Sequence, residues 1–344
     1  MKSGRDDALQ LTRLQSMRAG DKESFEGLIE PYRNELLAHC YRILGSFQDA
    51  EDVLQETLLR AWRHLDSFEG RSSLRAWLYK IATNACLDAL DGRRRRGLPA
   101  ELYARGDPHK PLPEPSTQII WVEAFPDTLI DQQPTVYPEA RVEVRESITL
   151  AFVAALQKLP GRQRAVLLLR DVMGWNANET GRTLDMSTSA VNSALQRARS
   201  TMKRSSRHAA QYIPTGLNEQ LSSLLGRYVA AWEAADSAAL VATLREDVRL
   251  TMPPFPVWFE GRRDIQTFLE GYLFRSADPF RVRLIPTPAN SSPAFAVYQA
   301  GASGVYRAAA LHVLTIESGA ISEIHDFLTF DGGLFSRFGL SLTA

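Results

Sequence analysis

Cysteine is scarce in this sequence of 344 residues, which contains only Cys40 and Cys86. Each lies inside an apolar helical pattern, so the pair gives neither a disulfide framework nor metal-ligand spacing. Apolar runs of 18 residues are also lacking, which argues against a membrane-spanning helix, and the amino terminus lacks the apolar core of a signal peptide. We therefore expect a soluble cytoplasmic protein in a reducing compartment, without membrane contact, metal or cofactor.

Net charge is lacking as well, because 40 basic residues balance 40 acidic ones. The charges are unevenly placed along the chain. Residues 187–207 contain five basic residues and no acid, and residues 71–96 contain seven basic residues and two acids. Between them, residues 97–140 contain eight prolines and seven acids against two basic residues. Two basic patches on either side of an acidic tether indicate two DNA-facing modules.

The length predicts two or three domains at roughly 150 residues per domain. We expect a mainly α protein with a helical domain over 1–97, a proline-rich acidic linker over 98–141, a second helical domain over 142–206 and an α+β domain over 214–344. The linker is expected to hold little helix or sheet. Its apolar stretch IIWVEAF indicates a segment that docks on another part of the chain.

The second basic patch has the pattern of a helix-turn-helix. Helical spacing predicts a first helix over 176–184, a turn at Asp185 and Met186, and a second helix capped by Ser187 or Ser189. Such a unit places its second helix in the major groove, with small polar groups early and arginines late. An ordinary basic surface helix is the competing interpretation of this stretch.

Two long motifs resemble one family. The stretch FEGLIEPYRNELLAHCYRILGSFQDAEDVLQETLLRAWRHLDSFEGRSSLRAWLYKIATNACLDAL resembles region 2 of an extracytoplasmic-function (ECF) RNA polymerase sigma factor of the sigma-70 type. LQKLPGRQRAVLLLRDVMGWNANETGRTLDMSTSAVNSALQRAR resembles region 4. The two motifs cover most of residues 22–205, in the order and with the gap that the family has.

The resemblance implies that core RNA polymerase and promoter DNA are the partners. It assigns contact with the clamp helices of the largest polymerase subunit to one helix face: Asp52, Gln55, Glu56 and Leu59. It assigns recognition and opening of the −10 promoter region to the segment around Trp77, where aromatic rings can stack on unpaired bases and cations can hold phosphates. The implied −10 residues are Phe68, Arg71, Ser72, Arg75, Trp77, Tyr79, Lys80, Asn84, Arg93, Arg94, Arg95 and Arg96.

For region 4 the resemblance implies contact with the polymerase β flap and with the −35 element. The implied −35 residues are Thr188, Ser189, Asn192, Ser193, Gln196, Arg197 and Arg199. Two departures from the family matter. Housekeeping members have two adjacent tryptophans where this chain has Trp77 and Leu78, which predicts weaker melting. Family members often place a basic residue where this chain has Asn192 and Ala194, which predicts weaker −35 binding. The acidic linker resembles the one that runs through the polymerase cleft.

Residues 214–344 are similar to a SnoaL-like, or NTF2-like, cone, a match carried by DVRLTMPP and WFEGRRDI. An amphipathic helix opens this segment, and alternating strands follow in FRVRLIP, AFAVYQA, AALHVLTIE and ISEIHDFLTF, which predict a curved antiparallel sheet. In the sigma subgroup that has this tail, the resemblance implies that the extra domain regulates activity in place of an anti-sigma factor.

Cones of this kind enclose pockets, and some relatives are cyclases or isomerases. The residues that would line a pocket for an unknown small ligand are Trp232, Phe255, Trp258, Phe259, Tyr272, Tyr298 and Asp326. Adjacent strand residues point to opposite faces, so His325 and Asp326 are not expected to form a catalytic dyad. Asp326 then either has a raised pKa in a pocket or sits at an exposed edge. Packing in the core is the competing interpretation for most of the aromatics, and no catalytic residue is predicted.

Three interpretations follow. The favoured one is a sigma factor whose fused cone controls how open the region 2 and region 4 module is. A second is a repressor or activator with a helix-turn-helix and a ligand-binding effector domain, which leaves the acidic stripe and the Trp77 segment unexplained. The third is an enzyme with a DNA-tethering arm, whose turnover would depend on Asp326 or His325.

Overall fold

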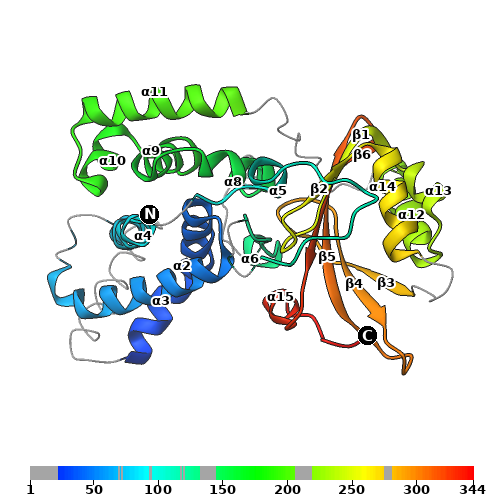
Figure 1. The fold of residues 1–344 in the computed structure, drawn as a ribbon. Helices are drawn as coiled ribbons and strands as arrows, with labels where there is room; N and C mark the ends of the chain where they lie inside the picture. Colours follow the sequence, from blue (N-terminus) through cyan, green and yellow to red (C-terminus); the bar gives the residue numbers. More distant parts are fainter. Residues whose placement is uncertain are drawn as a thin grey trace. The chain divides into compact units, whose positions relative to one another are not determined.

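The chain forms two compact units in this computed structural model (Figure 1). The helical unit comprises residues 1–94, 129–144 and 156–204, and the sheet unit comprises residues 95–128, 145–155 and 205–344. The structure describes residues 22–68, 70, 73–92, 95–116, 118, 121–131, 145–205, 219–274 and 281–344. The segment predicted to be a linker is thus divided between the units, and residues 95–128 belong with the sheet.

The helical unit begins with three long helices and ends with a helix-turn-helix. The first three are α2 (Lys22–Leu44), α3 (Phe47–Arg63) and α4 (Leu74–Leu90), with the short 3₁₀ helix η1 (Leu65–Ser67) between the last two. The later elements are α9 (Gly161–Leu167), the π-helical turn η2 (Leu168–Val172), α10 (Ala177–Leu184) and α11 (Thr188–Ser205). The helix α8 (Leu150–Gln157) comes before them, and all but its last two residues belong to the sheet unit.

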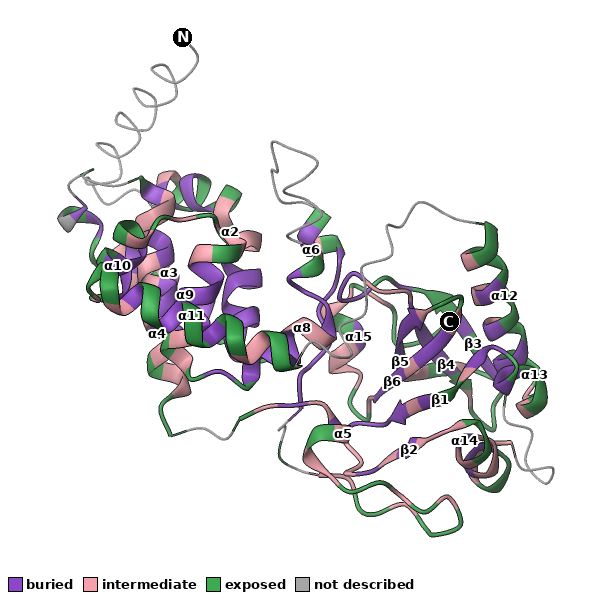
Figure 2. Cartoon of the chain, turned by 90° about the horizontal axis from the view of Figure 1, so that it is seen from above, coloured by how far each residue is buried: buried purple, intermediate pink, exposed green. Residues whose placement is uncertain are grey.

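Side-chain capping fixes the start of two of these helices. Ser46 Oγ accepts a hydrogen bond from Asp49 N at 3.1 Å and starts α3, and Ser73 Oγ accepts from Ala76 N at 3.2 Å and starts α4. Each bond satisfies one of the free N–H groups of the first turn. The buried faces of the helices point toward one another (Figure 2). α2, α3 and α4 therefore pack as one bundle.

A buried arginine joins the two halves of the helical unit. The Arg164 side chain on α9 is 3% exposed and donates to the carbonyls of Leu159 at 3.0 Å and of Ile43, at the end of α2. Gln157 Nε2 also donates to the carbonyl of Arg42 at 3.3 Å. A buried guanidinium is costly unless its donors find acceptors. The α9 end of the second half is therefore fixed to the C-terminal end of α2.

The sheet unit has six strands in the order β2-β1-β6-β5-β4-β3 (Figure 1). The strands are β1 (Leu244–Thr251), β2 (Trp258–Glu260), β3 (Val282–Pro286), β4 (Ala294–Ala300), β5 (Tyr306–Glu317) and β6 (Ala320–Leu328). One face is covered by α12 (Glu219–Glu233), α13 (Ser237–Val241) and α14 (Arg262–Phe268), which continues as the π-helical turn η4 (Leu269–Leu273). On the other face, α15 (Gly333–Arg337) packs Phe335 against Tyr298.

The four predicted strands pair antiparallel as expected, and a strand that was not predicted, β1, adds a parallel pair. β1 pairs with β6 in parallel, with Leu250 opposite Ile324, while the other pairs are antiparallel. The four strands predicted from alternation are present, and Ser318 and Gly319 form the β5–β6 turn with positive φ angles. β1 and β2 were not predicted as strands because the proline pair Pro253 and Pro254 lies between them, and β2 has only three residues.

Within residues 98–116, 118 and 121–131, the described part of the proline-rich connection, there is little regular structure, as expected. Its helices α5 (Pro99–Leu102) and α6 (Thr128–Asp131) have four residues each. Even so, Val122, Ala124 and Phe125 are fully buried. The predicted docking segment therefore does dock, and the part of the chain that receives it is the sheet unit.

Candidate functional site

The exposed face of α3 carries the four residues assigned to polymerase contact. Asp52 and Gln55 are exposed, Glu56 is half-buried, and Leu59 is 51% exposed, which is unusual for a leucine. Gln55 and Leu59 line an open groove of about 690 Å³ between α2 and α3. Its other lining residues are Phe25, Glu26, Ile29, Glu30, Arg33, Leu58 and Trp62. An apolar groove with acidic residues along its edge suits a partner helix that carries both apolar and basic side chains.

The segment assigned to the −10 region lies mostly on α4. Trp77 is half-buried, and its ring centroid lies 5.1 Å from that of the buried Phe68. Arg75 donates to the carboxylate of Glu35 at 2.9 Å and lies over the ring of Tyr79. The cations and rings are therefore brought together on one helix.

Tyr79 differs from its neighbours because it is only 1% exposed. Its ring packs against His39 and Trp175, at centroid distances of 4.8 and 5.7 Å. Burial raises the pKa of the Tyr79 phenol, and burial likewise lowers the pKa of His39 to about 3. In this structure Tyr79 is a core residue and presents no ring surface to a base.

The other residues assigned to the −10 region do not lie together on one element. Asn84 is half-buried on α4, Arg95 is exposed, and Arg96 Nη1 donates to the Trp121 carbonyl at 3.5 Å. Both of these arginines belong to the sheet unit. Arg71, Ser72, Arg93 and Arg94 lie outside the described residues.

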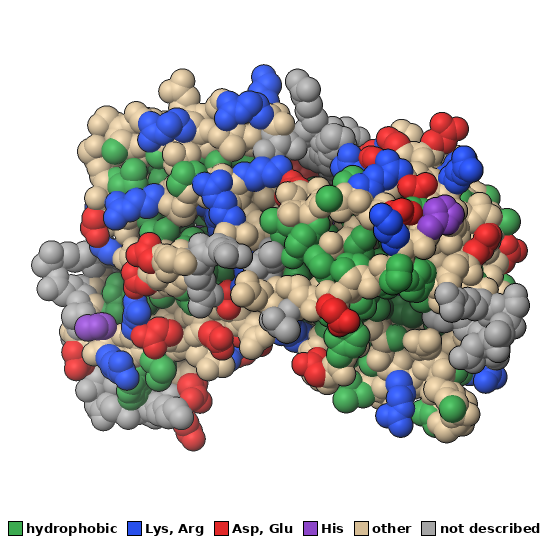
Figure 3. All heavy atoms as spheres, in the orientation of Figure 1, with side chains coloured by type: hydrophobic (Ala, Val, Ile, Leu, Met, Phe, Trp, Pro, Cys, Tyr) green, Lys and Arg blue, Asp and Glu red, His purple; other side chains and the backbone are tan. Residues whose placement is uncertain are grey.

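α11 presents all seven residues assigned to the −35 element. Val191, Ala194, Leu195 and Ala198 form its buried stripe, and Thr188, Ser189, Asn192, Ser193, Gln196, Arg197 and Arg199 are exposed. The predicted turn is present, since Asp185 adopts a left-handed conformation (φ 53°) and Ser187 Oγ accepts from Ala190 N at 3.2 Å. Figure 3 shows Lys and Arg side chains over this helix.

Arg199 is distinguished from Arg197 by an ion pair. Its Nε and Nη2 donate to the two carboxylate oxygens of Asp171 in η2, at 2.9 and 2.6 Å. This two-point contact raises the pKa of Arg199 and ties α11 to η2. Arg197 is therefore better placed than Arg199 to hold a phosphate.

The two segments assigned to the −10 and −35 elements touch each other inside the helical unit. Lys80 Nζ on α4 donates to the Arg182 carbonyl at 3.1 Å and lies 3.5 Å from the carboxylate of Asp185. Asp185 is the turn residue of the helix-turn-helix. A residue assigned to the −10 region is thus engaged by the turn before the −35 helix.

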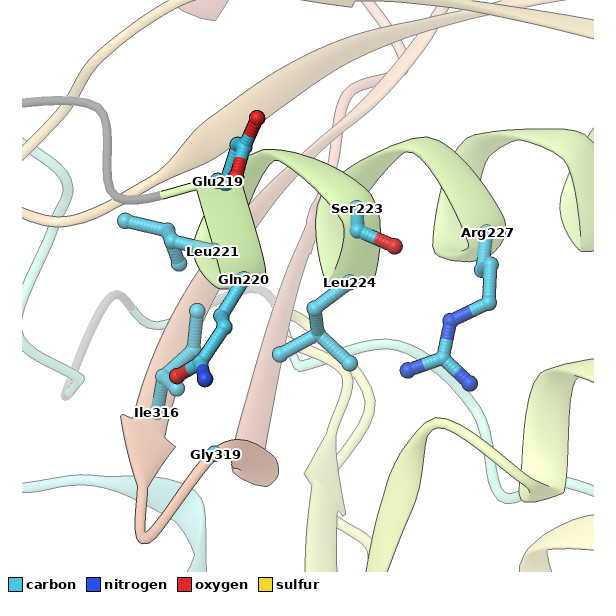
Figure 4. Close-up of a pocket in the computed structure, with 8 residues that line it drawn as sticks. All are labelled: Glu219, Gln220, Leu221, Ser223, Leu224, Arg227, Ile316 and Gly319. Atoms are coloured by element: carbon cyan, nitrogen blue, oxygen red, sulfur yellow. The ribbon is translucent and has the colours of Figure 1, made fainter.

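In the sheet unit the predicted pocket residues do not surround one cavity. Trp232, Phe259, Phe255 and Tyr272 belong to the core cluster under α12 and α14 or pack against it. The Trp258 ring lies beneath the guanidinium of Arg249, and Tyr298 is on the opposite face of the sheet, against Phe335. A pocket of about 690 Å³ has other walls, formed by the start of α12 and the β5–β6 hairpin (Figure 4). It is lined by Glu219, Gln220, Leu221, Ser223, Leu224, Arg227, Ile316 and Gly319.

Asp326 lies in a buried polar cluster and not at an exposed edge of the sheet. It is 6% exposed, and its Oδ1 is 3.5 Å from Nε2 of His312, whose Nδ1 is 2.9 Å from the Tyr228 hydroxyl. Burial raises the pKa of Asp326 to about 7 and lowers that of His312 to about 3. His325 points the other way, to Thr251 Oγ1 at 3.0 Å and Glu323. The argument from strand alternation against a His325–Asp326 dyad is confirmed.

Comparison with known proteins agrees with this geometry. Residues 28–96 match the model of sigma-70 region 2, residues 149–202 that of sigma-70 region 4, and residues 225–324 that of a SnoaL-like domain. The chain is 45% identical over 324 residues to the ECF RNA polymerase sigma factor SigG of Mycobacterium tuberculosis (strain ATCC 25618 / H37Rv), covering 94% of this chain and 85% of the relative. This chain belongs to the ECF RNA polymerase sigma factors.

Two further relatives delimit what the likeness covers. The sigma factor SigW of Bacillus subtilis (strain 168) is 27% identical over 56% of this chain and 94% of its own length. The crystal structure of the Mycobacterium tuberculosis sigma factor SigJ matches with a TM-score of 0.54 at 23% identity, over 94% of this chain and all of that one. This chain therefore shares its fold, over 94% of its length, with a solved protein.

Sequence reasoning about the sigma factor missed Tyr228 and His312. His312 lies directly opposite Asp326 in the β5–β6 register, a relation that becomes visible only once the register is known. Among the described residues, no group of three or more His, Cys, Asp or Glu side chains could hold a metal ion. In the same ranges, the longest apolar helical stretch falls short of what crossing a membrane requires.

Proposed function

We propose that this RNA polymerase-binding initiation factor contacts the polymerase clamp through the α3 face and reads the −35 element through α11. The observation that carries the proposal is that α11 has one buried apolar face and one exposed polar face. Its small apolar side chains are buried, and all seven polar and basic residues face solvent. A helix with this arrangement can lie in a major groove, with Asn192 or Gln196 on base edges and Arg197 on phosphate.

Reading a promoter requires the helical unit to open. The −10 and −35 elements lie about 25 base pairs apart, which at about 3.4 Å per pair is roughly 85 Å. In the closed unit Lys80 is within 3.5 Å of Asp185. Segments that touch cannot occupy two elements so far apart at once, so the proposal includes separation of region 2 from region 4 on the polymerase.

Membership of the sigma family is evidence for a transcription factor that performs no catalysis of its own. We assign the SnoaL-like domain a regulatory and not a catalytic role, since its predicted pocket residues do not surround one cavity and four of them pack in or against the core cluster. Because a sigma factor acts together with RNA polymerase, we also propose a cytoplasmic location.

The test is run-off transcription with the full chain and purified core polymerase on a library of −35 and −10 sequences, together with duplex binding without polymerase. Promoter-specific transcripts with weak binding to duplex DNA alone are expected. Tight binding to one duplex without polymerase, and no transcript, would instead support the repressor interpretation.

A further inference from the structure

Acidic side chains are absent from the part of the sheet where β3, β4 and β5 meet. Residues 281–316 contain three arginines and no aspartate or glutamate, although the whole chain has as many acidic as basic residues. Residues 341–344 run beside β5, since Ala344 N donates to the Tyr306 carbonyl at 3.1 Å, and their side chains include no acid either. The side chains at this end of the sheet therefore carry a net positive charge.

The strand register gathers the arginines. Arg283 on β3 lies opposite Tyr298 on β4, and the pairing of β4 with β5 places Tyr306 on the same face. Arg281 shares this face because alternate residues of a strand do so, whereas Arg307 follows Tyr306 and lies on the other face. We call the group of Arg281, Arg283, Tyr306 and Arg307 the sheet tip. It presents cations on both faces of the sheet.

The three arginines of the sheet tip are exposed and are not used by carboxylates. Within the part of the chain that the structure describes, no Asp or Glu forms an ion pair with any of them. Elsewhere on the same sheet, Arg245 and Arg249 both pair with acidic side chains. The guanidinium groups of the sheet tip are therefore available to an anion from outside the chain.

One of these guanidinium groups is held by an aromatic ring. The Arg283 guanidinium carbon lies 4.3 Å from the centroid of the Tyr306 ring, which joins β3 to β5 across β4. A ring attracts a cation placed over its face, and a guanidinium in this position keeps donors at its edge for an external acceptor. Arg283 is thus oriented before a ligand arrives.

The hairpin between β4 and β5 leaves room for a close approach. Its loop consists of the exposed short residues Gly301, Ala302, Ser303 and Gly304, with a positive φ of 78° at Gly304. The hairpin extends to the lower edge of the sheet unit in Figure 1. Strand pairs of this kind can enter a groove of DNA, and no bulky side chain in this loop prevents it.

We propose that the sheet tip is a further DNA-contacting surface of this chain, which holds phosphates of the DNA backbone. The inference rests on the proposed function, since it takes promoter DNA as the ligand. It extends that function from the two helical regions to the SnoaL-like domain, through a contact made by the domain itself.

Charge complementarity favours DNA as the occupant. Each strand of a duplex offers one negative charge per about 3.4 Å of helix axis, so cations on both faces of a narrow ribbon can each meet a phosphate. Guanidinium groups also match the geometry of phosphate oxygens. Gln299 is the one amide side chain among residues 294–308, so few groups could read base edges. The contact therefore adds affinity without adding sequence preference.

The test is the salt dependence of promoter binding by the holoenzyme formed from the full chain and core polymerase. Arg281→Gln with Arg283→Gln removes two charges and keeps both side chains polar. Because each neutralised phosphate contributes about 0.9 to the slope of log affinity against log salt, this slope should fall by roughly two units. The affinity should fall by the same factor on preferred and on altered −35 sequences.

A matched pair controls for the loss of net charge. Arg227 on α12 and Arg263 on α14 are also exposed, so Arg227→Gln with Arg263→Gln removes two charges from another part of the sheet unit. This pair should leave the slope at the wild-type value. Arg307→Gln alone should lower the slope by about one unit.

The ring of the sheet tip has a test of its own. Tyr306→Phe keeps the face that the Arg283 guanidinium covers, and should bind promoter DNA as the wild type does. Tyr306→Ala removes it and should weaken binding roughly two- to fivefold, the size of an exposed cation–π contact.

The outcomes separate the sheet tip from the promoter function. Unchanged slopes in both arginine pairs overturn the proposal, and so does an equal fall in both pairs, which would be an effect of net charge. Weaker binding of the sheet-tip pair to core polymerase, with an unchanged DNA slope, would assign the tip to an acidic protein surface instead. A wild-type holoenzyme that does not discriminate among promoters would overturn the promoter function, while a lower slope for the sheet-tip pair on the same DNA would still support the backbone contact.

Discussion

Asp326 and His312 face each other across β5 and β6, with Oδ1 of the carboxyl group 3.5 Å from Nε2 of the imidazole. Among the described residues, no donor forms a hydrogen bond to this Oδ1. Burial of this oxygen without a hydrogen bond makes the ionised carboxylate costly. Burial raises the pKa of Asp326 to about 7 and lowers that of His312 to about 3, so both groups are neutral between these values.

The raised pKa predicts a pH-dependent stability. The folded chain holds the Asp326 proton more tightly than the unfolded chain does, so the contribution of this group to stability falls as the pH rises from about 4 to about 7 and stays low above that. Asp326→Asn removes this loss. At about 1.4 kcal/mol per pKa unit, the variant should gain up to roughly 4 kcal/mol at about pH 8, and less as the pH falls toward 4.

Urea unfolding at several pH values measures this effect. Glu246→Gln, at an exposed position on β1, is the control for the change from an acid to an amide. A gain for Asp326→Asn that is equal at all pH values would mean that packing, and not ionisation, is responsible.

A second prediction concerns the closure of the helical unit. Gly161 starts α9, and a Cβ there would lie 3.2 Å from Leu87 Cδ2 and from Leu90 Cδ1 on α4. Gly161→Phe should therefore force α9 away from α4 and destabilise the closed form by about 1–3 kcal/mol. Small-angle scattering should give a larger radius of gyration.

The matched control for this wedge is Gly226→Phe on α12, where a Cβ meets nothing within 4 Å. It should leave both the radius of gyration and the melting temperature close to the wild type. An unchanged radius for Gly161→Phe would show that region 2 and region 4 do not rely on this contact.

Local patterns account for what could be predicted. The helix-turn-helix of α10 and α11 and the strands β3 to β6 follow from periodicity and turn residues within a few positions of one another. Tyr79 was misplaced because α4 packs against α2, α3, α9 and α10. A helix with neighbours on several sides buries more than the single stripe that periodicity indicates.

Non-local contacts account for what could not be predicted. The parallel pairing of β1 with β6 and the His312–Asp326 opposition depend on strand order. The buried Asn290 side chain bonds to the Phe125 amide and the Ile148 carbonyl, and both partners are more than 140 positions away in the sequence. No local pattern in the sequence contains these relations, whereas the apolar stretch around Trp121 did indicate that the connection docks.

A third prediction tests the α3 face. Leu59 is 51% exposed at the edge of the groove between α2 and α3, so Leu59→Glu should not disturb folding. A charge introduced into this apolar surface should weaken binding to core polymerase by about tenfold or more, equivalent to about 1.4 kcal/mol. Leu342→Glu, at a leucine that is 49% exposed in the sheet unit, is the control. Equal affinity of both variants for core polymerase would place the binding face elsewhere.

The fourth prediction separates sequence recognition from phosphate contact on α11. Asn192 lies in the early, polar part of the helix and Arg197 in the later, basic part. Asn192→Ala should weaken holoenzyme binding by about 1–3 kcal/mol on the preferred −35 sequence, with little effect on altered ones. Arg197→Ala should lower it on all sequences and reduce the dependence of binding on salt by about one unit of the logarithmic slope. Arg199→Ala should resemble neither, because this arginine pairs with Asp171 and its loss acts on the stability of the helix-turn-helix.

The measurement is holoenzyme binding to a panel of −35 variants at several salt concentrations. Identical sequence profiles for the Asn192 and Arg197 variants would contradict the division of roles along the helix.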